Sequence, residues 1–120
     1  MIKESVIELV GLVENGKLMD AFEKFYAEDV VMEEPFYGTT KGKEANRARE
    51  MAFLESVAEV HENKATNIVV DGNNSAVEWV LELTNKEGKR LRFEQLTMQN
   101  WKDGKIVHER FYYDLNSVAN

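Results

Sequence analysis

Residues 64–83 read KATNIVVDGNNSAVEWVLEL and contain two strand-like runs on either side of Asp71-Gly72-Asn73-Asn74. Turns rich in Gly and Asn favour a tight β-hairpin, because these residues adopt the left-handed backbone that such turns require. The sequence then continues with two more turn signals, at 85–88 and 102–104, and two more strand-like runs, at 89–101 and 105–114. The second half of the chain therefore predicts an antiparallel meander.

The first half of the chain has a helical period instead. One apolar stripe recurs at i, i+3, i+4 and i+7, formed by Val6, Leu9, Val10 and Val13. Asn15-Gly16 then ends this helix, and a second helix is predicted over residues 18–27. A third helix is predicted over residues 44–57, with inward positions at Ala45, Ala48, Met51 and Ala52. Helices followed by a meander predict an α+β fold.

Between the second and third helices, a short strand over Val30-Val31-Met32 is predicted to run into Glu33-Glu34-Pro35. The proline favours an extended backbone at Glu34. The glycine-containing stretch FYGTTKGK, residues 36–43, is predicted to be a loop. A long curved sheet wrapped over helices forms a cone, and a cone is expected to hold a pocket.

Length and composition exclude several classes of protein. The 120 residues include no cysteine, and 15 Lys+Arg against 22 Asp+Glu give a formal net charge of −7. Disulfide scaffolds, thiolate metal sites and cysteine nucleophiles are therefore excluded, and an acidic chain is poorly suited to bind nucleic acid. Apolar runs stay well short of the ~18 residues of a membrane span, and the N-terminus does not resemble a secretory signal. We expect one cytoplasmic domain over residues 1–120, with neither a membrane nor a nucleic-acid partner.

Strand alternation assigns side chains to the inside or outside of the curved sheet. On residues 75–83 the apolar face is that of Trp79, so this face is placed inside. The inward set of the last strand is Val107, Glu109, Phe111 and Tyr113. The inward set of the strand before it is Leu91, Phe93, Gln95, Thr97, Gln99 and Trp101. This leaves Leu96 and Met98 for a dimer contact on the outer face, and a β-bulge would reverse part of the assignment.

Three stretches resemble the nuclear transport factor two-like superfamily, within its SnoaL-like and ketosteroid-isomerase-like branches. They are FEKFYAEDVVMEEPFYGTTKGKEA (22–45), VVDGNNSAVEWVLEL (69–83) and NWKDGKIVHERFYYD (100–114). The resemblance covers nearly the whole chain. It implies a cone-shaped α+β barrel, with three N-terminal helices packed in a strongly curved, mixed, mostly antiparallel sheet, often dimerising through its outer face. The superfamily contains isomerases, cyclases, dehydratases, epoxide hydrolases and non-catalytic binding domains, so the fold does not give the function.

The resemblance carries over residue by residue. Ketosteroid isomerases place their general base directly before the proline that follows the second helix, and that position is Glu34 here. Their two oxyanion donors correspond to Val10 and Thr97, and neither can supply a strong acid. The Arg-x-Asp pair of limonene-epoxide hydrolases has no counterpart in AVEWVLEL, and Phe111 stands where their last aspartate does. The catalytic aspartate of SnoaL-like cyclases lies near Asp114, which alternation places outside.

Glu34 and Glu109 are the predicted catalytic residues. Burial of a carboxylate in an apolar cone raises its pKa, and such a group can take a proton from carbon beside a carbonyl. Two carboxylates in one pocket can act as acid and base. The structural alternatives are an exposed glutamate at position 34 and a salt bridge from Glu109 to an arginine such as Arg47 or Arg92. The predicted substrate-binding residues are Tyr37, Trp79, Phe93, Gln95, Thr97, Phe111 and Tyr113.

The sequence thus predicts a homodimeric SnoaL-like protein that binds an apolar or aromatic small molecule. If it is an enzyme, it is a cofactor-free isomerase, cyclase or dehydratase. The alternative is a non-catalytic ligand-binding or dimerisation domain. No cofactor is expected, because there is no phosphate-binding loop or dinucleotide fingerprint. No metal is expected, because His61 and His108 are far apart and lack ligand spacing.

Overall fold

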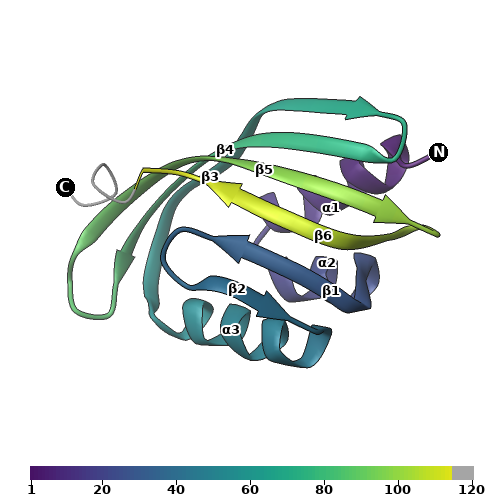
Figure 1. The fold of residues 1–120 in the computed structure, drawn as a ribbon. Helices are drawn as coiled ribbons and strands as arrows, with labels where there is room; N and C mark the ends of the chain where they lie inside the picture. Colours follow the sequence, from purple (N-terminus) through teal and green to yellow (C-terminus); the bar gives the residue numbers. More distant parts are fainter. Residues whose placement is uncertain (115–120) are drawn as a thin grey trace.

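The computed structural model describes residues 1–114, in which three helices lie on one side of a six-stranded sheet (Figure 1). The helices are α1 (Lys3–Glu14), α2 (Leu18–Phe25) and α3 (Lys43–Glu55). The strands are β1 (Tyr26–Glu34), β2 (Gly38–Lys41), β3 (Val57–Asp71), β4 (Asn74–Asn85), β5 (Arg90–Lys102) and β6 (Lys105–Tyr112). The α+β cone predicted from the sequence is confirmed.

The strand order is β2-β1-β6-β5-β4-β3, and every neighbouring pair is antiparallel except β1 and β6, which are parallel. The sheet curls around the helices without closing, since β2 and β3 remain its two edges (Figure 1). The parallel pairing brings the last strand of the chain against the first. Met32 is thereby the register partner of Glu109, although the two are far apart in sequence.

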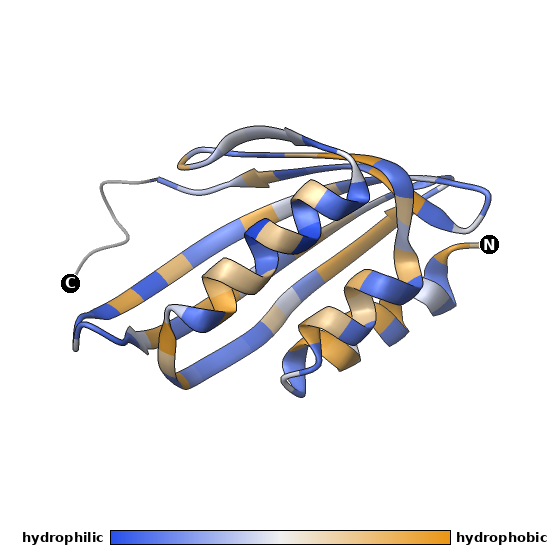
Figure 2. Cartoon of the chain, turned by 90° about the horizontal axis from the view of Figure 1, so that it is seen from below, coloured by the Kyte–Doolittle hydropathy of each residue, from blue (hydrophilic) through white to orange (hydrophobic). Residues whose placement is uncertain are grey.

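The core lies between the helices and the concave face of the sheet. The predicted stripe of α1 supplies Val6, Leu9 and Val10, and α2 supplies Phe22 and Phe25. The sheet contributes Val30, Met32, Val77, Trp79, Trp101 and Ile106. Seen from below, the helices lie across the sheet, and hydrophobic and hydrophilic residues alternate along its strands (Figure 2). Alternation is what directs one set of side chains to this core.

The orientation of α3 differs from the prediction. Its inner face carries the buried Asn46 and the half-buried Arg49 and Glu50, whereas Ala45 is exposed and Met51 is 47% exposed. Asn46 fixes this rotation, because its Nδ2 donates to the carbonyl of Gly42 at 2.8 Å and to that of Thr40 at 3.1 Å. Buried backbone carbonyls need donors, so the helix turns its amide inward rather than its methionine.

Two further details of the sheet differ from the prediction. The stretch 36–43 is not a simple loop, since β2 forms within it and pairs with the end of β1. On β6 the ladder to β5 is interrupted between Asn100 and Trp101, which places Ile106 rather than Val107 in the core. An extra residue of this kind is a β-bulge, and it reverses the faces on one side of itself only. The inward assignment of Val107 is therefore wrong, and that of Glu109 is right.

Candidate functional site

Glu109 lies at the centre of a buried chain of hydrogen bonds, which we call the Glu109 network. Only 2% of Glu109 is exposed. The Tyr26 hydroxyl donates to its Oε1 at 2.5 Å, and the Gln99 Nε2 donates to its Oε2 at 2.7 Å. Ser75 Oγ then donates to Gln99 Oε1 at 2.6 Å, and Trp101 Nε1 donates to Ser75 Oγ at 2.9 Å. Four strands thus converge on one carboxyl group.

Burial raises the pKa of Glu109 to about 7, and the hydrogen bonds from Tyr26 and Gln99 oppose this rise only in part. The pKa of the Tyr26 phenol is raised as well, first by burial and then by the negative charge of Glu109. Both effects have the same origin, because a charged group loses its hydration when it is removed from water. Near neutral pH, Glu109 is therefore able both to give and to take a proton.

A second cluster, the Glu34 group, consists of Glu34, Tyr37, Arg49, Phe111 and Tyr113. The Tyr113 hydroxyl donates to Glu34 Oε2 at 2.6 Å, and the Tyr37 backbone N–H donates to Glu34 Oε1. Burial, and next the hydrogen bond to Glu34, raises the pKa of Tyr113. Phenols with a raised pKa stay protonated, so Tyr113 acts as a donor that orients the Glu34 carboxylate.

Arg49 and Glu50 bring charge from α3 to the same region. Arg49 Nη2 lies 3.2 Å from Glu50 Oε1, and the two side chains are only 11% and 14% exposed. The guanidinium carbon lies 5.3 Å from the centre of the Tyr37 ring and 6.0 Å from that of Phe111. Burial raises the pKa of Glu50, the charge of Arg49 opposes this, and the charge of Glu34 adds to it. Glu34 and Glu50 are therefore close enough to influence one another.

The two clusters share one face of the sheet. Glu34 follows Met32, the register partner of Glu109, by two residues on β1, so the Glu34 and Glu109 side chains project to the same side. One such step along a strand is ~6.7 Å. Glu33 projects to the other side, where Arg110 Nε donates to its Oε2 at 3.1 Å and His108 also contacts it. Because side chains alternate along β1, Glu33 forms a surface ion pair and its neighbour Glu34 is the candidate base.

Neither structural alternative for the two glutamates matches these contacts. Glu34 is half-buried and accepts two hydrogen bonds, so it is not an exposed edge residue. Glu109 has the neutral partners Tyr26 and Gln99, whereas Arg47 pairs with Glu23 and Arg92 pairs with Glu82. The alternative of a salt bridge from Glu109 to an arginine such as these is therefore wrong.

The remaining predicted binding residues are distributed between the core and the rim. Trp79 and Thr97 are buried against each other, with Trp79 Nε1 donating to Thr97 Oγ1 at 3.3 Å. Phe93 packs edge-on against Tyr113 with ring centres 5.5 Å apart, and Gln95 is half-buried. Tyr37 is 47% exposed. Asp114 lies after the end of β6 and is exposed, so strand alternation does not apply to it.

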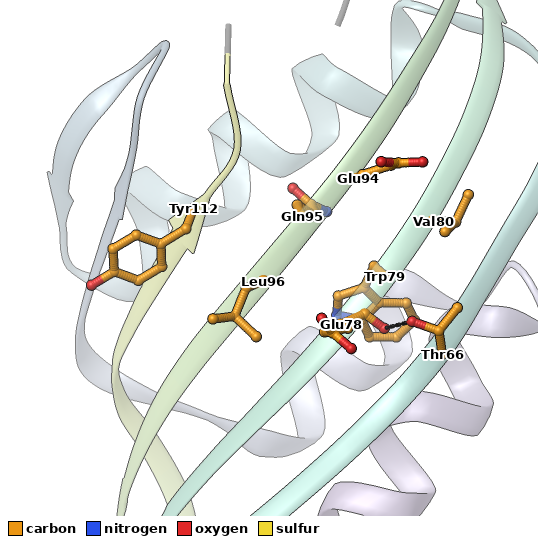
Figure 3. Close-up of a pocket in the computed structure, with 8 residues that line it drawn as sticks. All are labelled: Thr66, Glu78, Trp79, Val80, Glu94, Gln95, Leu96 and Tyr112. Atoms are coloured by element: carbon orange, nitrogen blue, oxygen red, sulfur yellow. Dashed lines mark hydrogen bonds between the residues drawn. The ribbon is translucent and has the colours of Figure 1, made fainter. Parts of the chain in front are cut away.

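Two surface hollows of the structure are bordered by no residue of the Glu109 network or the Glu34 group. One, of about 350 Å³, is bordered by Lys3, Ile7, Ile68 and Val70, between α1 and β3. The other, of about 320 Å³, lies on the sheet among Thr66, Glu78, Val80, Glu94, Leu96 and Tyr112, and Trp79 and Gln95 also border it (Figure 3). Its rim carries two carboxylates and no cation, so it offers no ready partner for an anionic ligand.

Sequence reasoning did not include the hydrogen-bond partners of Glu109, or Arg49 and Glu50, among the site residues. Tyr26 and Gln99 hold Glu109, and Arg49 and Glu50 lie beside Glu34. A signal for the last two was present, because Asn46, Arg49, Glu50 and Phe53 follow the i, i+3, i+4, i+7 period of a helix face. The stripe was overlooked because it is polar, whereas an inward face is usually sought among apolar residues.

A model of the SnoaL-like domain family matches residues 2–113. This chain belongs to the SnoaL-like domain family. A crystal structure of a proposed SnoaL-like polyketide cyclase from Mesorhizobium loti is 30% identical, with a TM-score of 0.86, and the match covers 94% of this chain and 99% of that one. No curated protein sequence matches the chain.

Other solved structures share the fold at lower identity. A proposed hydroxylase from Streptomyces galilaeus is 13% identical with a TM-score of 0.76, and the match covers 96% of this chain and 90% of that one. A proposed isomerase from Bacillus subtilis is 18% identical with a TM-score of 0.74, over 92% of this chain and 84% of that one. These two likenesses show the fold alone, which hosts different chemistries.

No helix in residues 1–114 is both long and apolar enough to cross a membrane. Within the same range, no three His, Asp or Glu side chains are grouped so that they could hold a metal ion.

Replacing Gln99 by leucine should lower the free energy of unfolding by about 1–3 kcal/mol, because it removes one of the two hydrogen bonds to Glu109 and the acceptor of the Ser75 hydroxyl. The matched control is Gln95→Leu, on the same strand and face but only half-buried, for which we expect less than ~1 kcal/mol. Urea denaturation of both variants measures the difference. Equal losses would mean that the Glu109 network does not stabilise the fold.

Proposed function

We propose that this SnoaL-like protein binds an apolar or aromatic small molecule that contains a carbonyl group, and that it catalyses proton transfer without a cofactor. Isomerisation, aldol-type cyclisation and dehydration are the reactions that such transfer permits. Glu34 is the base, and Glu109 is the partner acid. The rings of Tyr37, Phe93, Phe111 and Tyr113 supply the apolar wall, with Trp79, Gln95 and Thr97 as deeper contacts.

The observation that carries this proposal is the difference between two carboxyl groups on one face of the sheet. Glu34 is half-buried and is held by Tyr113 and the Tyr37 backbone, whereas Glu109 is fully buried with a pKa raised to about 7. Pairs of titratable groups whose environments differ in this way are typical of acid–base catalysis. The cyclase from Mesorhizobium loti and the isomerase from Bacillus subtilis, which share this fold, are proposed to act in this class of reaction.

Ligand binding tests the proposal first. A series of cyclic ketones, steroids and aromatic ketones is titrated by calorimetry against the wild type, Glu34→Gln and Glu33→Gln. We expect ligands to bind the wild type, and Glu34→Gln to change the pH dependence of their affinity. Glu33→Gln is the control, because Glu33 is the neighbouring carboxylate but faces the other side and pairs with Arg110. Absence of binding, or an equal effect of both variants, would contradict the proposal.

A non-catalytic binding domain is the second candidate. One observation favours it: both oxygens of Glu109 accept a hydrogen bond from a neutral donor, which is how a structural buried carboxyl is satisfied. The two candidates differ in one respect that can be measured, since only the enzyme exchanges carbon-bound protons of its ligand with solvent.

We also propose that the protein works as a homodimer in the cytoplasm. Leu96 and Tyr112 are exposed on the outer face of the sheet, on neighbouring strands and in register with each other. Exposed apolar side chains that adjoin one another are common at subunit interfaces. Analytical ultracentrifugation over a range of concentrations tests this. A mass that stays near 13.8 kDa throughout would rule the dimer out.

A further inference from the structure

Arg49 carries a buried donor without an acceptor. Its side chain is 11% exposed, and its Nε has no hydrogen-bond partner among the described residues. The contacts of the guanidinium are made by Nη2, with Glu50 Oε1 at 3.2 Å and the Met32 sulfur at 3.8 Å. A buried N–H left unpaired is costly and rare in folded proteins, and the cost is larger for a charged group. Such a donor can be paired by ordered water or by an acceptor atom of a bound ligand.

The surroundings of Arg49 place this donor beside the proposed base. Its guanidinium lies against the rings of Tyr37 and Phe111, and the backbone N–H of Tyr37 donates to Glu34. Aromatic rings hold a planar cation and exclude water from it, which strengthens its hydrogen bonds. A ligand acceptor bound to Arg49 would therefore lie in the same region as the ligand proton that Glu34 removes.

The other strong donors nearby are already in use. The Tyr113 hydroxyl donates to Glu34, and the Tyr26 hydroxyl donates to Glu109. The Thr97 hydroxyl lies 3.4 Å from the Val77 carbonyl and also accepts from Trp79. In the two clusters, Arg49 is thus the donor that has a buried N–H without an acceptor among the described residues.

We propose that the Arg49 guanidinium binds the carbonyl oxygen of the ligand and stabilises the oxyanion that forms when Glu34 removes a proton from the adjacent carbon. This inference rests on the proposed function and adds to it a residue that was not among those predicted from the sequence. In the step, the carbon–hydrogen bond breaks and the proton goes to a Glu34 oxygen. The electron pair forms the new carbon–carbon double bond, and the former carbonyl π pair moves to the oxygen.

This step conserves charge within the site. One negative charge leaves Glu34 as it is protonated, and one appears on the ligand oxygen beside Arg49. Hydrogen bonds from a cation to an oxyanion are roughly twice as strong as those between neutral groups, and preorganised donors of this kind contribute strongly to catalysis. The ion pair to Glu50 keeps Nη2 in place, so Glu50 acts as a positioning residue.

The test uses 1-phenylbutane-1,3-dione, an aromatic 1,3-diketone whose enolate absorbs at longer wavelength than its neutral form. Absorbance is followed against pH with the diketone bound to the wild type, Arg49→Gln, Arg49→Lys and Arg47→Gln. For the wild type, we expect the bound diketone to ionise at lower pH than it does in free solution. In Arg49→Gln the midpoint should rise by about 1–2 pH units, a ~10–100-fold loss of enolate at fixed pH.

Arg47→Gln is the matched control. It removes the same charge from the same helix, but Arg47 pairs with Glu23, away from Glu34 and Glu109. With this variant, the enolate population of the bound diketone at fixed pH should change less than ~2-fold. Arg49→Lys keeps the charge and should recover part of the loss. Because Arg49→Gln leaves Glu50 buried without its cation, the double variant Arg49→Gln/Glu50→Gln is measured beside it, and circular dichroism checks that both are folded.

The outcomes separate this inference from the function beneath it. A diketone that binds but ionises at the same pH in folded Arg49→Gln and in the wild type overturns the role of Arg49 and leaves the proposed function standing. A wild type that binds neither the diketone nor any ketone of the series overturns both. A midpoint that rises in both Arg49→Gln variants and not in Arg47→Gln supports the inference.

Discussion

Glu34→Gln should slow the exchange of the α-protons of a bound ketone with solvent deuterium by about 10²–10⁴-fold. The amide is nearly isosteric, and its oxygen can accept from the Tyr37 backbone N–H while its NH2 group donates to the Tyr113 hydroxyl, but it cannot take a proton. The loss should therefore fall on the exchange rate and much less on the affinity. Proton NMR in deuterium oxide, with a ketone found in the binding screen, measures the rate directly.

Glu33→Gln is the control for this experiment too. Its side chain lies on the opposite face of β1, where it contacts His108 and Arg110, so the exchange rate should change less than ~3-fold. If the wild type exchanges no α-protons of any ligand it binds, the non-catalytic alternative is correct. If Glu33→Gln and Glu34→Gln slow exchange equally, neither is the base.

The second large effect is expected in the pH dependence of stability. The pKa of Glu109 is about 7 in the folded protein, against 4.5 for the ordinary carboxyl. Between these two pH values the folded state binds the proton and the unfolded state releases it. The free energy of unfolding therefore falls as the pH rises through this window. At ~1.4 kcal/mol per pH unit, the contribution of Glu109 amounts to roughly 3 kcal/mol between pH 4 and pH 8.

Comparison with Glu109→Gln isolates this contribution. Glutamine has nearly the same shape and does not titrate. The free energy of unfolding of the wild type should therefore fall by roughly 3 kcal/mol more than that of the variant between pH 4 and pH 8. Exposed carboxylates with a lowered pKa, such as Glu82, contribute equally to both proteins and cancel. Urea denaturation across the pH range measures the difference. Parallel curves for the two proteins would show that Glu109 titrates normally, and Glu28→Gln, an exposed site on β1, should leave the curve unchanged.

The periodic pattern of apolar and polar residues along the chain determined most of the fold. The apolar stripe of α1, the hairpin turn at 71–74 and the alternation on β6 are properties of neighbouring residues, so they can be recognised from the sequence alone. The inward position of Glu109 followed from the same alternation. Where a bulge interrupted the ladder, the prediction was wrong at Val107, because the position of a bulge depends on the facing strand.

Tertiary contacts determined the composition of the site. Tyr26 and Glu109 are 83 residues apart, and only the parallel pairing of β1 with β6 brings their strands together. The rotation of α3 is set by hydrogen bonds from Asn46 to the carbonyls of Thr40 and Gly42, and this rotation turns Arg49 toward the sheet. No local pattern encodes such partners, since a polar side chain is directed inward by the unpaired groups it meets there.

By itself, then, the sequence determined the α+β class, the succession of helices and strands, and the side of the sheet on which Glu109 stands. Only the tertiary structure decided that neutral partners surround Glu109 and that an arginine with an unpaired Nε lies beside the Glu34 group. The physical reason is range. Backbone periodicity acts over a few residues, whereas desolvation and hydrogen bonding depend on whichever distant segments the folded sheet brings together.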